Sequence, residues 1–119
     1  MATSEHFTEA ELACRHCGLN EMEADFLVRL ELLRENLGAK PMTVTSGYRC
    51  PAHNQAVSST GASGPHTTGR AVDIRVRGIE MIDMVVAARA AGFLGFGISQ
   101  KGGSRFLHLD DLSARCWSY

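Results

Sequence analysis

Apolar residues recur at helical spacing in two long stretches of the chain, residues 21–37 and 79–91. Both stretches end at a glycine, which is the usual residue just past a helix C-terminus. The apolar positions of the first stretch are Met22, Phe26, Leu30, Leu33 and Leu37. Because a spacing of three or four residues places side chains on one helical face, the pattern predicts two helices that supply much of the core.

A shorter helix is predicted to begin after Thr8. Thr8 and Glu11 have the spacing of a capping box, in which each side chain bonds to the other residue's backbone N–H. Phe7 and Leu12 flank the box as a hydrophobic staple. We expect this helix to run into a turn at residues 14–18.

Other stretches have the composition or alternation of β-strands. Residues 41–46 are rich in β-branched side chains, and residues 71–76 alternate apolar and polar positions. Residues 95–99 and 105–110 flank a Gly-rich segment with hairpin composition. Between the first two strands, residues 51–63 begin with a possible helical turn and continue as a loop. Together these elements predict an α+β fold.

Period-two alternation assigns a face to each residue of two strands. Val72, Ile74 and Val76 share one face of their strand, so Asp73 lies on the other. In the last strand Leu107 and Leu109 point to the core, which places His108 and Asp110 on the opposite face with Phe106. If the two strands are neighbours, Asp73 and His108 rise from one open surface.

Length, composition and charge restrict the class of protein. With 119 residues, 45% of them hydrophobic, the chain fits one domain spanning residues 1–119. The net charge of -1 and the pI of about 6.5 give no reason to expect nucleic acid or an anionic membrane as a partner. No window contains the roughly 18 apolar residues of a membrane span, and no basic leader precedes an apolar run. We therefore expect synthesis in the cytoplasm without a signal peptide.

His66 lies in a Gly-flanked loop from which it can reach Asp73 and His108. Two imidazoles and one carboxylate suit a catalytic zinc ion, because three protein ligands leave a fourth position open for water. A simpler alternative is also open at this point. His66 is then a loop residue, Asp73 pairs with Arg70 or Arg75, and His108 is a hydrogen-bonded strand residue.

The four cysteines, Cys14, Cys17, Cys50 and Cys116, raise a separate question. Cys14 and Cys17 form half of a zinc knuckle, which Cys50 and Cys116 would complete if the chain ends approach each other. Disulfides and free thiols are the alternatives. We expect the remaining histidines to lie on the surface, although each is a possible alternative ligand; they are His6, His16 and His53. Trp117 and Tyr119 are expected to hold down the C-terminal segment rather than to bind a ligand.

Three motifs carry a resemblance to a known family: SGYRCPAHN, SGPHTTGRAVDI and FLHLD. In order and spacing they resemble the zinc D-alanyl-D-alanine carboxypeptidase family, which includes phage endolysin peptidases and shares its fold with hedgehog signalling domains. The resemblance covers roughly residues 40–112. It implies that His66, Asp73 and His108 hold Zn²⁺, and that Arg49, with Ser46 beside it, binds substrate.

The chain departs from the family pattern at the general base. Many relatives carry a glutamate three residues before the last histidine, where this chain has Arg105. Two roles stay open for Asp110: it accepts the proton of the zinc-bound water, or it orients a histidine ligand. Asp111 points the other way in a regular strand and is expected at the surface.

The resemblance implies a small, mainly antiparallel sheet with helices on one face and a zinc cleft on the other. It also implies a hydrolase, a zinc metallopeptidase that cleaves peptidoglycan stem peptides as a carboxypeptidase or endopeptidase. We expect a phage or prophage enzyme, acting at the bacterial cell wall, either released by a holin-type partner or mounted on the phage tail. The alternatives are a non-catalytic hedgehog-like zinc domain that binds cell-wall peptide or a protein partner, and a cysteine-zinc interaction module.

Overall fold

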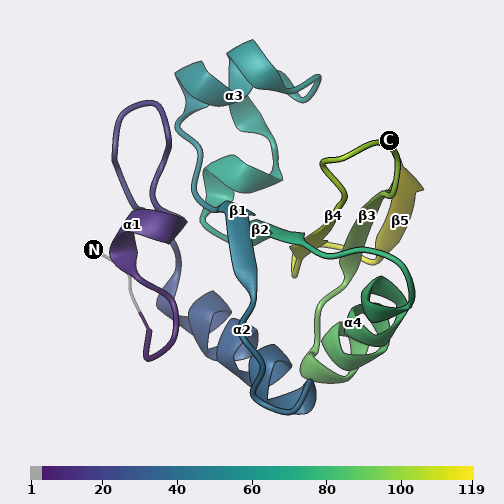
Figure 1. The fold of residues 1–119 in the computed structure, drawn as a ribbon. Coiled ribbons are helices and arrows are strands. Elements are labelled where there is room, and N and C mark those ends of the chain that lie inside the picture. Colours follow the sequence, from purple (N-terminus) through teal and green to yellow (C-terminus); the bar gives the residue numbers. More distant parts are fainter. Residues whose placement is uncertain (1–3) are drawn as a thin grey trace.

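A five-stranded sheet forms the centre of the computed structural model, which describes residues 4–119. The strand order is β1-β2-β4-β3-β5, with β5 parallel to β3 and every other pair antiparallel. The strands are β1 (Thr43–Ser46), β2 (Ala71–Arg75), β3 (Gly95–Ser99), β4 (Phe106–Asp110) and β5 (Arg115–Ser118). The predicted α+β class and mainly antiparallel sheet are confirmed (Figure 1).

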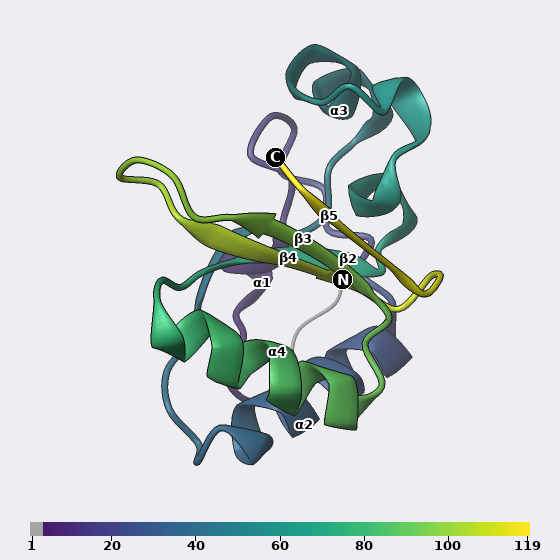
Figure 2. The same cartoon turned by 90° about the vertical axis from the view of Figure 1, so that its right-hand side faces the viewer.

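Helices cover one face of the sheet and leave most of the other face to the site. Figure 2 shows α2 and α4 together beneath the sheet and α3 on the opposite side. The helices are α1 (Glu9–Leu12), α2 (Ala24–Asn36), α3 (Pro51–Val57) and α4 (Ile79–Ala91), with 3₁₀ turns η1 (Gly61–Ser63) and η2 (Pro65–Thr68). No helix among residues 4–119 is long and apolar enough to cross a membrane.

The helix ends follow local chemistry. At α1 both bonds of the predicted capping box form: Glu11 N–H donates to Thr8 Oγ1 at 3.2 Å, and Thr8 N–H donates to Glu11 Oε1 at 2.7 Å. α2 begins at Ala24, three residues later than the apolar pattern suggests. The reason is that Glu23 N–H is bound to Gly69 O at 2.9 Å, so the residues before it join the loops around the site.

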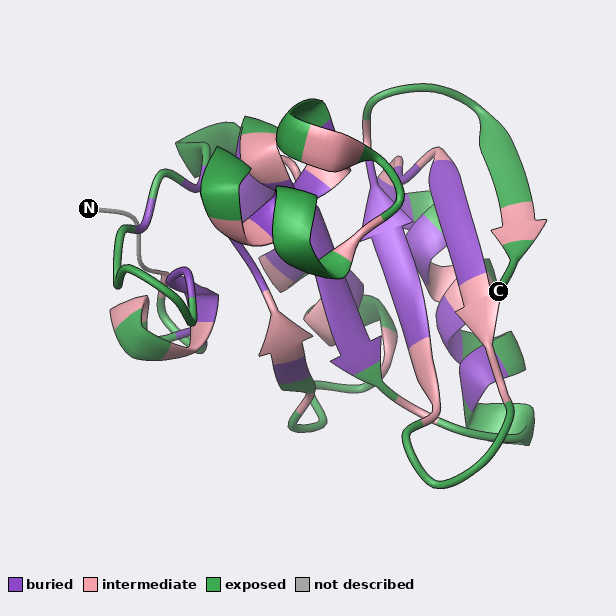
Figure 3. Cartoon of the chain, turned by 90° about the horizontal axis from the view of Figure 1, so that it is seen from above, coloured by how far each residue is buried: buried purple, intermediate pink, exposed green. Residues whose placement is uncertain are grey.

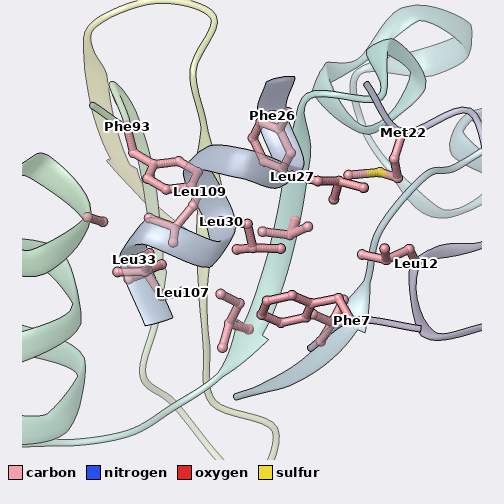
Figure 4. Close-up of a cluster of buried hydrophobic side chains, with 14 of the residues drawn as sticks. Phe7, Leu12, Met22, Phe26, Leu27, Leu30, Leu33, Phe93, Leu107 and Leu109 are labelled. Atoms are coloured by element: carbon pink, nitrogen blue, oxygen red, sulfur yellow. The ribbon is translucent and has the colours of Figure 1, made fainter. Parts of the chain in front are cut away.

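The core lies between the sheet and the helix layer. Figure 4 shows side chains of α2 packed against those of β4 and the N-terminal segment, with Phe26 and Phe93 in an edge-to-face contact at 5.5 Å between ring centroids. Leu107 and Leu109 are fully buried, as the alternation of their strand predicts. Each such side chain contributes about 1.5–3 kcal/mol on burial. Burial differs between the strands: Figure 3 shows β2 and β4 largely buried and β5 mostly exposed.

Strand β5 is the element that the sequence pattern did not predict. It pairs in parallel with β3, and Trp117 lies opposite Gly97. A Cβ atom on Gly97 would come within 2.7 Å of the indole ring. The glycine therefore allows the Trp117 ring to lie directly on the sheet, on the side away from the helices.

Candidate metal centre and cleft

Two strands and one 3₁₀ turn bring the three predicted ligands together. Asp73 on β2 is the direct partner of His108 on β4, and η2 places His66 above them. His66 Nε2 lies 3.2 Å from Asp73 Oδ1, and His108 Nδ1 lies 3.1 Å from the same oxygen. All three side chains are buried, and their ligand atoms lie within 4.8 Å of one another.

The remaining ring nitrogens fix the histidine tautomers. His66 Nδ1 lies 2.8 Å from the carbonyl oxygen of Gly47, which can only accept a hydrogen bond, so Nδ1 carries the proton. His108 Nε2 lies 2.8 Å from Asp110 Oδ2 and carries the proton for the same reason. Without a metal, His66 Nε2 and His108 Nδ1 can hydrogen-bond to Asp73; once they give up any proton on that side, their lone pairs both face Asp73. Two neutral imidazoles and one carboxylate with converging lone pairs fit a divalent transition metal such as zinc.

The charges of the centre agree with this donor set. Burial raises the pKa of Asp73, but hydrogen bonds from His108 and His66 outweigh it and hold that pKa well below its usual range. Burial lowers the pKa of His108, but its bonds to Asp110 and Asp73 raise it overall. Asp73 is thus ionised at neutral pH, as a metal ligand must be.

Asp110 lies behind His108 rather than in front of it. Its carboxylate is fully buried and accepts from His108 Nε2, from Arg115 Nη2 at 3.1 Å and from the backbone N–H of Leu112 at 3.2 Å. His108 Nε2 is the nitrogen that points away from Asp73. Of the two roles predicted for Asp110, this geometry favours orienting the histidine, because the imidazole ring separates the carboxylate from the metal position.

Arg49 enters the same site from the loop after β1. Its Nη1 donates to Asn54 Oδ1 at 2.8 Å, its Nη2 donates to Ser46 Oγ at 3.1 Å, and Nη2 lies 3.9 Å from Asp73 Oδ2. Ser46, predicted beside the substrate, thus supports the guanidinium. Asn54 was missed by the sequence reasoning, although it ends the SGYRCPAHN motif. It is fully buried, and its Nδ2 donates to Thr60 Oγ1 at 2.8 Å, which fixes the amide toward Arg49.

A cleft of about 590 Å³ opens over the three ligands. Arg49 and Asn54 line one side of it, and residues of β5 line another. Trp117 and Tyr119, expected to hold down the C-terminal segment, pack on the sheet: the Trp117 ring lies 5.0 Å from the His108 ring and the Tyr119 ring 5.2 Å from the Phe106 ring, and both residues also line the cleft. Strand β5 forms this wall of the cleft because it pairs in parallel with β3.

One expectation about a carboxylate is wrong, and one alternative for Asp73 does not hold. Asp111 is not a surface residue: its side chain is 3% exposed and forms ion pairs with Arg70 at 2.9 Å and Arg29 at 3.4 Å. Arg70 also binds Asp25 at 2.7 Å. Its guanidinium therefore does not pair with Asp73, and the alternative in which Asp73 serves only as a partner for Arg70 does not hold.

The structure brings three of the four cysteines together. The sulfur atoms of Cys14, Cys17 and Cys50 form a second group of possible metal ligands, again within 4.8 Å of one another. The expectation that Cys116 completes this group is wrong. Cys116 is exposed on β5, at one edge of the sheet, whereas Cys50 lies in the loop after β1, the strand at the opposite edge. All four cysteines are free thiols in the structure.

The sequence was also compared with known families and proteins. The profile of the family described as peptidase M15 matches residues 5–110, which include every residue of the candidate metal centre. The comparison with curated proteins gives no match.

Proposed function

Because the chain belongs to the peptidase M15 family, we propose that it is a zinc-dependent peptidase that hydrolyses peptidoglycan stem peptides. The observation that carries the proposal is the convergence of His66 Nε2, Asp73 Oδ1 and His108 Nδ1 on one position at the floor of a cleft. These three residues would hold the zinc ion. A zinc ion held by three protein ligands lowers the pKa of a bound water to about 7 and polarises a carbonyl group.

Arg49 is the proposed anchor for the substrate. A guanidinium carries five N–H donors in a planar fork, so its bonds to Asn54 and Ser46 leave others to meet a carboxylate in the cleft. These two hydrogen bonds also fix the orientation of the guanidinium before the ligand binds, which reduces the entropy lost on binding. The terminal carboxylate of a stem peptide, or a carbonyl oxygen of an internal bond, fits this fork.

Asp110 and strand β5 complete the proposed site. Asp110 holds the proton of His108 on Nε2 and thereby keeps Nδ1 available as a ligand. Arg115 links the wall to this support, since it bonds to Asp110 and its guanidinium carbon lies 4.4 Å from the Trp117 ring centroid. A peptide in the cleft would lie against the Trp117 ring beside the metal position.

A second candidate function is binding of cell-wall peptide without catalysis. It is favoured by one observation: among the described residues that line the cleft, Asp73 has the only carboxylate side chain, and that side chain is already assigned to the metal. The residues described around the cleft thus include no second acidic side chain for the proton transfer that peptidases of this kind require. Both candidates use the same metal centre and the same Arg49 fork.

Purified peptidoglycan separates the two candidates. We expect the zinc-loaded protein to release free amino groups, and the simultaneous assay of free D-alanine to show whether cleavage is internal or terminal. A His66→Ala variant should release neither. If the wild-type protein binds the peptide but releases no amino groups, the non-catalytic function replaces the peptidase.

We further propose that the protein acts at the bacterial cell wall as a phage endolysin or a phage tail peptidase. Lysis of susceptible cells on addition of the protein from outside would support this site of action. An endolysin that needs a holin-type partner should lyse cells from inside only when that partner is produced with it.

A further inference from the structure

We propose that Cys14, Cys17, Cys50 and His16 form a second zinc site, which is structural rather than catalytic. None of these four residues lines the cleft. The three cysteine sulfurs lie within 4.8 Å of one another, and His16 Nδ1 lies 3.6 Å from Cys50 Sγ. The site would join the turn after α1 to the loop that carries Arg49.

The spacing of the three sulfur atoms, and that of Cys50 Sγ and His16 Nδ1, is close to the spacing in a tetrahedral zinc site. Zinc binds sulfur at about 2.3 Å and imidazole nitrogen at about 2.0–2.1 Å. For a tetrahedron, these bond lengths place a sulfur about 3.5 Å from a nitrogen and two sulfurs about 3.8 Å apart. The observed separation of 3.6 Å between Cys50 Sγ and His16 Nδ1 agrees with the first value. The sulfur separations need to close by no more than about 1 Å.

Backbone hydrogen bonds hold the turn of Cys14 in place and point an N–H donor at its sulfur. Cys14 N–H donates to Leu19 O at 2.7 Å and Gly18 N–H donates to Cys14 O at 2.9 Å, which closes the turn between Cys14 and Cys17. Gly18 adopts φ +78°, a conformation that few other residues adopt without strain. The N–H of Cys50 points at Cys14 Sγ at 3.4 Å. Hydrogen bonds of this kind stabilise a thiolate, which is the form that binds zinc.

This site has four protein ligands, as structural zinc sites do, whereas the cleft has three, as catalytic zinc sites do. Three thiolates and one imidazole fill all four positions from the protein, so no position is left for water. The cleft site offers three ligands and an open position. The His16 ring also lies parallel to the His53 ring, with centroids 5.6 Å apart and an interplanar angle of 4°, which makes His53 the matched neighbour for testing His16.

The proposed site lies next to the residues that support the Arg49 guanidinium. Cys50 follows Arg49 directly and is the N-cap of α3, and its sulfur accepts from His53 N–H at 3.4 Å. Helix α3 carries Asn54, which holds the Arg49 guanidinium. A metal bound by Cys50 would therefore fix both the loop of Arg49 and the helix that supports it. Classical zinc knuckles stabilise small loops in this way where the hydrophobic core is too small to do so.

Zinc content and cobalt spectra of the full chain test the proposal. We expect two zinc ions per wild-type chain, and one each in His66→Ala and in Cys17→Ser. After cobalt replacement, His66→Ala should keep the intense thiolate-to-cobalt absorption, and Cys17→Ser should lose it. His66→Ala removes the cleft site alone, so failure of the proposed peptidase and failure of this site are distinguishable.

The fourth ligand needs a matched pair of variants. His16→Ala should lower zinc affinity at the cysteine site, and the stacked neighbour variant His53→Ala should leave it near the wild-type value. The reverse result would refute His16 as the ligand. A wild-type protein with no thiolate-to-cobalt absorption, or with a disulfide between these cysteines by mass spectrometry, would overturn the site itself, and neither measurement requires a variant that folds.

Discussion

Replacement of Asp110 by asparagine distinguishes an orienting residue from a proton acceptor. The substitution keeps the shape of the side chain but exchanges one acceptor oxygen for an NH₂ group. In the structure all three partners of this carboxylate are donors: His108 Nε2, Arg115 Nη2 and the N–H of Leu112. An asparagine NH₂ group must face at least one of them, whichever way the amide is turned.

Each orientation of the amide has a definite consequence. If the NH₂ group faces Leu112 N–H, a buried donor loses its acceptor, at about 1–3 kcal/mol. If it faces His108, the imidazole must take the other tautomer, and Nδ1 then carries a proton instead of a lone pair. Zinc binding requires the first orientation, because only that one leaves Nδ1 of His108 free, so binding carries the cost of about 1–3 kcal/mol. Since 1.36 kcal/mol corresponds to a factor of ten, we expect zinc affinity at the cleft to fall by about 5- to 150-fold. Loss of other groups that orient metal ligands reduces affinity by a similar factor, about 10–100.

The assay is turnover as a function of free zinc concentration. If Asp110 only orients His108, the variant should need more zinc and should regain most of its turnover when the cleft site is saturated. If Asp110 accepts a proton during the reaction, turnover should stay about 10²- to 10⁴-fold below that of the wild type at every zinc concentration. That second result would refute the reasoning. Asp111→Asn is the matched control, because Asp111 is the adjacent carboxylate and pairs with arginines instead of the histidine.

Four further predictions follow from the same geometry. Arg49→Lys should raise KM for peptides with a free terminal carboxylate by about 10- to 150-fold, because it replaces a charged hydrogen-bonding fork worth about 1.5–3 kcal/mol, and steady-state kinetics would show this with little change in zinc content. Gly95→Ala should destabilise the fold by about 1–3 kcal/mol and weaken zinc binding, because its Cβ would lie 2.2 Å from Asp110 Oδ1; denaturant unfolding and zinc titration measure the two effects. Zinc affinity should fall as pH decreases, starting above the ordinary histidine pKa of about 6.5, because His108 binds a proton more tightly than usual when the metal is absent; calorimetric titrations across this range would show it, and a pH-independent affinity would contradict it. Gly97→Ala should displace the Trp117 ring from the sheet and weaken peptide binding while leaving zinc content unchanged, as fluorescence of this single tryptophan would report.

The sequence predicted those parts of the site that depend on local periodicity. Alternation in two strands placed Asp73 and His108 on the face opposite Val72 and Leu107, and the structure pairs them directly. The helix ends that depend on one glycine or one capping box were also predicted. These features are settled by neighbours within a few positions of the chain.

The features that the sequence did not predict depend on contacts between distant segments. Strand β5 joins the far edge of the sheet, so its pairing decides that Trp117 enters the cleft and that Cys116 stays away from the other cysteines. The burial of Asp111 depends on Arg70, which directly precedes β2, and on Arg29 of α2. The side of His108 that Asp110 occupies depends on a rotamer, which alternation alone does not specify.

The direct pairing of Asp73 with His108 means that the ion and the strand register are linked. Because side chains alternate, a slip of one residue between β2 and β4 would send one of these ligands into the core. Only a chain with the correct alignment can therefore capture the ion. By mass action, zinc would draw molecules out of misaligned states and into the native one, so that metal uptake during refolding reports correctly assembled sheets.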